Sequence, residues 1–252
     1  NGVCTASTDQ VDVALQQTPT ASAAGPDQNI CGTSALLAAN TPGVGSGVWS
    51  VFSGAGGSFV LNTNPTTTFN GVAGTTYILR WTISNGVCAS SSDDVQIRLD
   101  ASPTVANAGT DQTGGSAICG TSTTLAGNVA GVGTGTWSIV SGAGGSFVSP
   151  NSPTTVFNGV AGTTYTLQWT IANGVCTAST DQVDVALQQT PTASAAGPDQ
   201  NICGTAATLA ANNPIAVGTG VWSFAPGGNP DALPLTAFSN TAVYNSTFTG
   251  TA

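Results

Sequence analysis

The stretch that decides the fold runs from residue 161 to residue 187 and reads AGTTYTLQWTIANGVCTASTDQVDVAL. Between Thr163 and Ile171 its side chains alternate with the period of two that is typical of a β-strand, and Val175 to Leu187 continues as a second strand. The Asn173-Gly174 pair between them is a strong signal for a tight hairpin turn. This stretch therefore predicts a β-hairpin.

The same hairpin recurs along the chain. Residues 73–99 read AGTTYILRWTISNGVCASSSDDVQIRL, residues 1–15 match the second half of the hairpin, and residues 1–33 are identical to residues 173–205. Self-similarity at a period of about 85 residues is typical of tandem arrays of domains. We therefore expect this chain to be a piece of a longer array.

The repeat divides the chain into four segments. Residues 1–17 are expected to be the last strand of a preceding repeat, residues 18–100 and 101–188 two complete repeats, and residues 189–252 an incomplete one. The linkers carry a proline at Pro19, Pro103 and Pro191. Because proline restricts the backbone, we expect neighbouring domains to be held in line.

Seven short strands are predicted within the first complete repeat. They cover residues 20–24, 35–39, 47–52, 58–61, 66–70, 75–84 and 87–99, and glycine- or proline-rich turns separate them. Short strands at this spacing, without helical periodicity, predict an all-β protein made of immunoglobulin-like (Ig-like) antiparallel β-sandwich domains in an elongated array. The expected core anchors are the five tryptophans, Trp49, Trp81, Trp137, Trp169 and Trp222.

The composition excludes several classes of function. All eleven acidic residues are Asp, only two residues are basic, and the formal net charge is −9. Such a chain should avoid nucleic acids and anionic membrane surfaces, and without a continuous apolar run of about 18 residues we expect no insertion into a membrane. The absence of His, Lys and Glu removes the usual catalytic bases and nucleophile partners, and the adjacent Asp93 and Asp94 would point to opposite faces of a strand. We therefore expect no enzymatic activity.

One family resemblance covers nearly the whole chain. The run at residues 106–112 (ANAGTDQ), followed by Thr136-Trp137-Ser138 and the strand at residues 165–171 (YTLQWTI), resembles the PKD family of Ig-like modules. The added cysteines and the phrase GTWSIVSGAGGSF at residues 135–147 resemble the variant found in tandem in very long, type IX-secreted surface adhesins of gliding bacteria. This resemblance implies an extracellular fibre or stalk at the cell surface and does not identify a ligand.

The six cysteines are Cys4, Cys31, Cys88, Cys119, Cys176 and Cys203. In a chain of secreted character we expect them to be oxidised, and without a Cys-x-x-Cys motif or any His a zinc site is disfavoured. An inter-domain bond from Cys31 to Cys176 is slightly favoured, because strand length places the two cysteines of one domain at opposite ends of the sandwich. Intra-domain bonds from Cys31 to Cys88 and from Cys119 to Cys176, or a bond from Cys88 to Cys119, remain alternatives.

Four aspartates at repeated positions are candidate calcium ligands, namely Asp27, Asp93, Asp111 and Asp181. A calcium site normally needs six to eight oxygen ligands, and the sequence contains no dense Asp-x-Asp-x-Asp loop. The alternative is that Asp27 caps a turn and Asp93 blunts an edge strand. No other cofactor is expected.

The leading hypothesis for function is structural. Tandem domains would form a stiff, disulfide-stabilised stalk of an extracellular filament or surface adhesin, with further repeats of the same chain as partners. The first alternative is an adhesive module that binds a surface glycan or protein, for which Phe52 is the least constrained aromatic residue. The second is a fibre polymerised by strand exchange.

Overall fold

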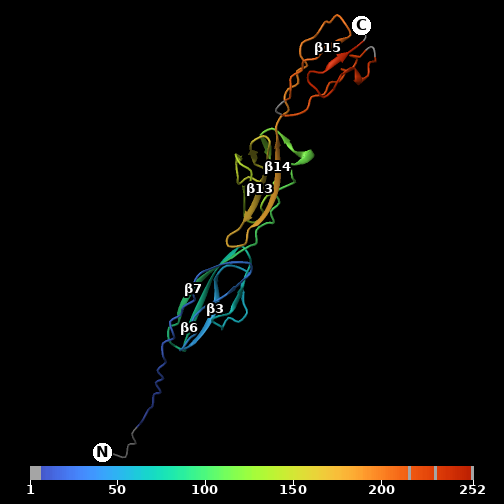
Figure 1. Cartoon of the computed structure of the whole chain (residues 1–252). Coiled ribbons are helices and arrows are strands. Elements are labelled where there is room, and N and C mark those ends of the chain that lie inside the picture. The colour runs from blue at the N-terminus through green and yellow to red at the C-terminus, as the bar shows by residue number, and fades with distance from the viewer. Residues whose placement is uncertain (1–6, 215–216, 230–231, 251–252) are drawn as a thin grey trace, which may run out of the picture.

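The computed structural model describes residues 7–214, 217–229 and 232–250. Three β-rich units follow one another along a line, with the N-terminal segment extending from one end (Figure 1). We refer to residues 18–100 as domain 1, to residues 101–188 as domain 2, and to residues 189–252 as the third repeat. Within the described ranges, no helix is long and apolar enough to span a membrane.

Domain 1 is a sandwich of two sheets. The larger sheet has the order β1 (Gln28–Cys31), β7 (Ser91–Asp100), β6 (Thr75–Ser84), β3 (Ser46–Ser53), and the smaller has the order β2 (Ser34–Leu36), β5 (Thr68–Asn70), β4 (Ser58–Phe59). Strand β1 pairs with β7 in parallel, and all other pairs are antiparallel. This topology confirms the predicted class of tandem, Ig-like antiparallel β-sandwiches.

Domain 2 repeats this arrangement. Its larger sheet has the order β10 (Thr134–Ser141), β13 (Thr163–Ala172), β14 (Ser179–Gln188), β8 (Ile118–Cys119), and its smaller sheet has the order β11 (Ser146–Phe147), β12 (Val156–Asn158), β9 (Ser122–Thr124). The insertion before Cys119 forms the 3-10 helix η1 (Gly114–Ser116). The third repeat contains the pair β15 (Ala206–Thr208) and β16 (Thr247–Thr249) and the 3-10 helix η2 (Leu235–Ala237).

The core of each complete domain is built on a tryptophan pair. The ring centroids lie 5.2 Å apart for Trp49 and Trp81 and 5.1 Å apart for Trp137 and Trp169, and each of these residues is at most 3% exposed. A Cβ atom at Gly47 would lie 2.0 Å from the Trp81 ring, so only glycine lets that indole lie against the neighbouring strand. The two sheets therefore close over stacked and tilted aromatic rings.

The prediction that Trp222 is a core anchor is wrong. Trp222 is only half-buried and stacks on Phe238 at a centroid distance of 6.3 Å. The physical reason is that the described part of the third repeat contains no strand equivalent to β6 or β13, which supply the second tryptophan in the complete domains. Its indole Nε1 donates a hydrogen bond to Val243 O at 3.0 Å, as Trp49 Nε1 donates to Pro65 O at 3.3 Å.

Two predicted strands are also not observed. Residues 20–24 form no strand, because backbone N–H groups in this segment donate to side chains, from Ser22 to Ser91 Oγ at 2.9 Å and from Ala24 to Asp93 Oδ2 at 2.7 Å. Residues 7–17 form no strand either, and no other described segment pairs with them. Their apolar residues Val11, Val13 and Leu15 are 76–94% exposed, whereas the equivalent residues Val95, Ile97 and Leu99 of β7 are at most 1% exposed. Residues 1–6 lie outside the described residues.

The hairpin itself differs from its prediction at the turn. Strands β13 and β14 pair from Thr163 with Leu187 to Ile171 with Ser179, so both strands are present. Their connection spans residues 173–178, which we call the β13–β14 loop, and the predicted two-residue turn at Asn173-Gly174 is therefore wrong. Residues of this loop bind Asp100 and Ala101 at the end of domain 1, which explains why they leave the ladder.

Candidate functional site: the junction between domains 1 and 2

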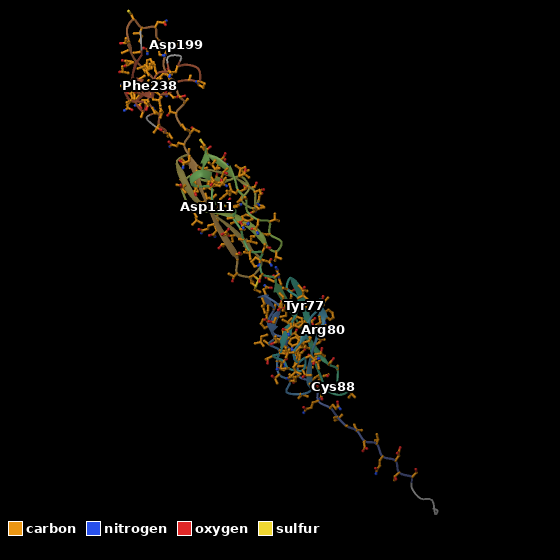
Figure 2. All side chains as sticks on the ribbon, turned by 90° about the vertical axis from the view of Figure 1, so that its right-hand side faces the viewer. Tyr77, Arg80, Cys88, Asp111, Asp199 and Phe238 are labelled. Atoms are coloured by element: carbon orange, nitrogen blue, oxygen red, sulfur yellow. A yellow bond between two sulfur atoms is a disulfide. The ribbon has the colours of Figure 1, made fainter. Side chains whose placement is uncertain are left out.

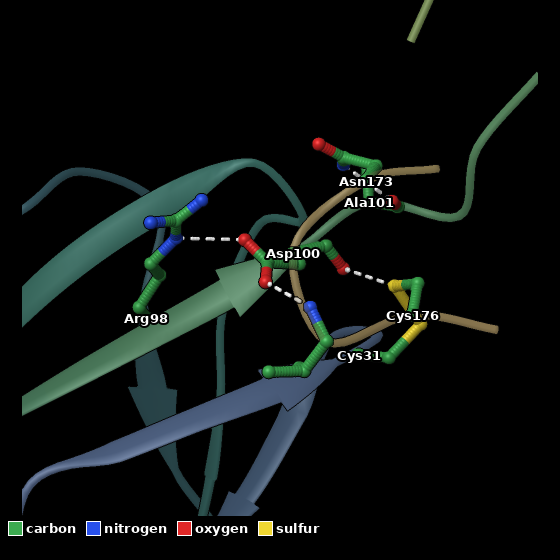
Figure 3. The surroundings of a disulfide bond; sticks show 7 residues. Cys31, Arg98, Asp100, Ala101, Asn173 and Cys176 are labelled. Atoms are coloured by element: carbon green, nitrogen blue, oxygen red, sulfur yellow. Dashed lines mark hydrogen bonds and ion pairs between the residues drawn. A yellow bond between two sulfur atoms is a disulfide. The ribbon is translucent and has the colours of Figure 1, made fainter. Parts of the chain in front are cut away.

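A disulfide bond joins Cys31 at the end of β1 to Cys176 in the β13–β14 loop. The sulfur atoms are 2.06 Å apart and the Cα atoms 4.9 Å apart, which is inside the range that a disulfide needs. Figure 3 shows how the loop of domain 2 reaches the end of domain 1 at this bond. Of the pairings considered from the sequence, the structure therefore contains the inter-domain one.

Asp100, the last residue of β7, is the polar centre of the junction. It is only 4% exposed, and its Oδ2 accepts a hydrogen bond from the Val175 backbone N–H at 3.0 Å. Its Oδ1 accepts from Arg98 Nε at 2.7 Å. The pKa of the Asp100 carboxyl is lowered, chiefly by the Val175 N–H and also by the Arg98 guanidinium, although burial opposes this shift.

Two further contacts shape the loop around Asp100. Asn173 Nδ2 donates to Ala101 O at 2.7 Å, across the linker between the domains. Gly174 has a φ of +54°, and a Cβ atom there would lie 1.8 Å from Asp100 Oδ2. Only glycine combines this backbone conformation with so close an approach. Asn-Gly in the hairpin therefore serves the junction, since it brings Val175 and Cys176 against domain 1.

Domain 1 presents the same loop to the segment that precedes it. Val87 N donates to Gln16 Oε1 at 3.0 Å, and Asn85 Nδ2 donates to Gln17 O at 2.7 Å. Gln16 therefore takes the place that Asp100 has at the observed junction. Cys88 Sγ lies 3.6 Å from Gln16 O, as Cys176 Sγ lies 3.6 Å from Asp100 O. Figure 2 places Cys88 at the end of domain 1 from which the N-terminal segment extends.

The cysteines Cys88, Cys119 and Cys203 are unpaired, and Cys4 lies outside the described residues. The alternatives that joined Cys31 to Cys88, Cys119 to Cys176 or Cys88 to Cys119 are therefore not the bonds of this structure. The reason is geometric, because Cys31 lies opposite Asp100 at one end of β7 while Cys88 precedes the other end. A strand of that length separates the two sulfur atoms far beyond the reach of a disulfide.

The four candidate calcium ligands each accept a backbone hydrogen bond. Asp93 Oδ2 accepts from Ala24 N at 2.7 Å and Asp27 Oδ1 accepts from Gln96 N at 2.8 Å. The equivalent bonds of domain 2 run from Ala108 N to Asp181 Oδ2 at 2.8 Å and from Asp184 N to Asp111 Oδ1 at 2.9 Å. These carboxylates tie the segment that leads into β1 or β8 to the last strand of the same domain. Across the described ranges, no three or more His, Cys, Asp or Glu side chains are grouped in a way that would hold a metal ion.

One surface cluster is found in domain 1 alone. Phe52 is 61% exposed, and Arg80 Cζ lies 4.0 Å from the centroid of its ring. Arg80 also pairs with Asp94 through a 2.7 Å contact between Nε and Oδ1, which lowers the pKa of Asp94. Domain 2 has Val140 and Gln168 in place of the aromatic and the cation. Phe52 was predicted from the sequence as the least constrained aromatic residue. Arg80 was not predicted, because its partners become its neighbours only through the pairing of β6 with β3 and β7.

The fold and the junction define the class of protein, a tandem array of Ig-like β-sandwich domains with neighbouring domains joined end to end. No family model matches the sequence, and no curated protein matches it. Among solved structures, the chain is similar to the PKD domain from the KIAA 1837 protein, with 18% identity, 36% of this chain and 93% of that chain covered, and a TM-score of 0.29.

Two multidomain structures are similar over more of the chain. They are extracellular domains of Drosophila OTK, with 11% identity, 68% of this chain and 60% of that chain covered and a TM-score of 0.44, and an I-band fragment of titin, with 11% identity, 79% and 78% covered and a TM-score of 0.42. At such identities the likeness concerns the fold alone.

Proposed function

We propose that this chain is the structural repeat region of an extracellular filament or cell-surface adhesin, in which it forms a stiff, disulfide-stabilised stalk. The observation that carries this proposal is the Cys31–Cys176 bond, which fastens domain 2 to domain 1 outside the main-chain linker. Disulfides persist in oxidising compartments, which agrees with a location outside the cell. The partners of each domain are then further repeats of the same chain.

The stiffness follows from the number of connections at the junction. A single flexible linker would let two domains swivel, whereas here the peptide chain at Asp100-Ala101 and the disulfide connect the domains at two points. The Val175–Asp100 and Asn173–Ala101 hydrogen bonds add directional contacts between the same two domains. Pro103 restricts the backbone immediately after the linker. Rotation of one domain against the other would have to break these contacts together.

The finer assignment is part of the same proposal. The phrase at residues 135–147 and the cysteine pattern support a stalk displayed on the surface of a gliding bacterium and exported by the type IX route. The full-length sequence tests this assignment. We expect many further repeats and a C-terminal sorting domain, and a parent protein without a sorting domain would contradict it.

Residual dipolar couplings measured by NMR test the stalk itself. In the oxidised chain, domains 1 and 2 should report the same alignment tensor, because they move as one body. In the variant Cys31→Ala with Cys176→Ala, the two tensors should differ in magnitude. A wild-type chain whose two domains align independently would contradict the stalk.

The cluster of Phe52 and Arg80 favours a second candidate function, binding of a surface glycan or protein by domain 1. An exposed aromatic ring beside a cation offers a stacking face and hydrogen-bond donors. A glycan array probed with the intact chain and with Phe52→Val tests this candidate, because valine is the residue that domain 2 carries there. Binding that disappears in the variant would support recognition by domain 1, and the absence of any binding would leave the stalk as the function.

A further inference from the structure

The disulfide changes the route by which tension passes through the chain. A pull along the array enters domain 1 from the N-terminal segment and leaves domain 2 at the end of β14, whose last residue is Gln188 (Figure 1). The shortest covalent path follows the backbone to Cys31, crosses to Cys176 and follows β14 to Gln188. The segment between the two cysteines, which are 145 residues apart in sequence, lies outside this path. It includes β3, β6 and β7 of domain 1.

The segments that remain on the path have little slack. They include β1 and β14, in which the backbone is already extended at about 3.3 Å per residue. The bypassed segment, by contrast, could lengthen to roughly 500 Å if it were unfolded and drawn out, at no more than about 3.6 Å per residue. Tension therefore cannot draw that length out of domains 1 and 2 while the bond is intact.

Cys119 occupies the same position in domain 2 that Cys31 occupies in domain 1. Cys119 lies opposite Gln188 in the parallel pair of β8 with β14, as Cys31 lies opposite Asp100. Gly120 N donates to Gln188 O at 2.9 Å, and Gly32 N donates to Asp100 O at the same distance. Cys119 is exposed, so the end of domain 2 presents a thiol where the end of domain 1 carries its half of the disulfide.

Cys88 presents the other half of the same junction. Its loop already makes, with Gln16 and Gln17, the hydrogen bonds that the β13–β14 loop makes with Asp100 and Ala101. Cys31 and Cys119 therefore lie at strand ends, whereas Cys88 and Cys176 lie in loops. Each complete domain has one strand-end cysteine and one loop cysteine, at opposite ends of the domain. The observed bond shows that the two kinds fit each other.

We propose that Cys119 bonds to the loop cysteine of the following repeat and Cys88 to the strand-end cysteine of the preceding repeat, so that two interleaved covalent threads carry tension along the array. This inference deepens the proposed stalk and rests on it. One thread crosses the disulfide from Cys31 to Cys176 and then follows the backbone to Cys203. The other thread follows the backbone from Cys88 to Cys119. The threads lie side by side in each complete domain, as the parallel pairs β1 with β7 and β8 with β14.

The chemistry of each new bond is an ordinary thiol–disulfide exchange. Two thiols lose two protons and two electrons as the S–S bond forms. A low-molecular-weight disulfide such as oxidised glutathione, or an oxidoreductase disulfide, accepts them and becomes two thiols. No other group is consumed or released.

Two lengthened chains test the pairing. In the first, residues 101–188 are duplicated after Gln188, and the second copy is marked by Thr177→Ser. After oxidation with glutathione disulfide, a non-reducing chymotryptic map should link Cys119 of the first copy to Cys176 of the marked copy. In the second, residues 17–100 are duplicated ahead of domain 1, the added copy is marked by Thr33→Ser and Ala89→Ser, and Cys31 of the marked copy should link to the unmarked, original Cys88.

Control variants separate guided pairing from random oxidation. Gly174→Ala in the marked copy should reduce the yield of its new bond, because the added methyl prevents the loop from closing on the preceding strand end, while the original Cys31–Cys176 bond still forms. With the Cys31–Cys176 bond intact, alkylation of Cys119 of the first copy in the first chain, or of the original Cys88 in the second chain, would overturn the two threads. So would bonds from Cys119 or Cys88 to a cysteine of its own domain.

Force spectroscopy of the 252-residue chain measures the bypass directly. Pulled by its ends without reductant, the chain should lack the roughly 500 Å of extension held between Cys31 and Cys176, and added dithiothreitol should release it. Full extension without reductant would overturn the load path. Failure of the threads can be distinguished from failure of the proposed stalk. Rigidly aligned domains whose Cys119 and Cys88 stay unpaired in the lengthened chains would support the stalk and contradict only the threads.

Discussion

Removing the Cys31–Cys176 bond should uncouple the unfolding of the two domains. Cys31 is held beside Asp100 at the end of domain 1, so that the bond fixes Cys176 close to the start of domain 2. If domain 2 alone unfolds, the bond closes a loop of about 75 residues, and if domain 1 alone unfolds, the loop has about 70 residues. When both domains are unfolded there is one loop, set by the separation of 145 residues.

The loop lengths set the size of the effect. On the chain-entropy model, each single-domain loop raises the free energy of the partly unfolded state by about 4.5 kcal/mol, and the large loop raises that of the fully unfolded state by about 5 kcal/mol. The intermediate with one folded domain is therefore disfavoured by about 4 kcal/mol relative to independent domains. The joint transition of the oxidised chain involves about 170 residues, so the loss of about 5 kcal/mol lowers the melting temperature by about 10 to 20 °C.

Differential scanning calorimetry checks this prediction. Oxidised wild-type chain should melt domains 1 and 2 in one transition, whose van't Hoff enthalpy matches the calorimetric enthalpy of both. The variant Cys31→Ala with Cys176→Ala should melt them separately and at lower temperature. The matched control, Cys88→Ala with Cys119→Ala, removes two unpaired thiols and should change neither. If the bond-free variant keeps the single transition within a few degrees of wild type, the coupling argument is refuted.

Three further predictions concern single side chains. Gly174→Ala should slow formation of the junction disulfide in a thiol-quench time course, whereas Gly86→Ala, whose added methyl meets only the exposed Gln16 side chain, should not. The pKa of Asp100 is lowered in the folded chain, so its ionised carboxylate stabilises the junction at pH values above the unfolded pKa of about 3.9. This contribution is lost as the pH falls through the lower pKa of the folded state. An acid titration should therefore loosen the wild-type junction, and Asp100→Asn should show a smaller pH dependence. Tyr77→Phe removes a buried hydroxyl that bonds two loops, and chemical denaturation should show domain 1 losing about 1 to 2 kcal/mol.

The central strands of each domain were predictable because local sequence and tertiary burial agree there. The predicted strand at residues 75–84 has the observed bounds of β6, and its alternating residues Tyr77, Leu79, Trp81 and Ile83 are all fully buried. A period of two with large apolar residues on one face leaves no competing arrangement. The start of each domain was not predictable in this way, because residues 20–24 bond to side chains of Ser91 and Asp93, nearly 70 residues away along the chain.

The junction was predictable in its cysteines and not in its polar contacts. Strand length and the order of strands were enough to place Cys31 and Cys88 at opposite ends of a domain. The role of Asp100 was missed because its partner Val175 belongs to the next domain, and a residue at the end of a strand looks like an exposed linker in the sequence. The signal that could have revealed it is the constant polar character of this position, which is Gln16, Asp100 and Gln188 in successive repeats.

The composition also explains why the covalent link between domains 1 and 2 is a disulfide. With only two basic residues and no Lys, the chain has few ion pairs to place at its junctions and no amine for an amide crosslink between side chains. Small domains with modest cores need additional fastening, and here only cysteine can supply a covalent one. A bond within a domain would stabilise that domain and leave the linker as the only connection to the next. A bond between domains, such as the one from Cys31 to Cys176, connects two domains at once, and in the proposed stalk it would serve stability and stiffness together.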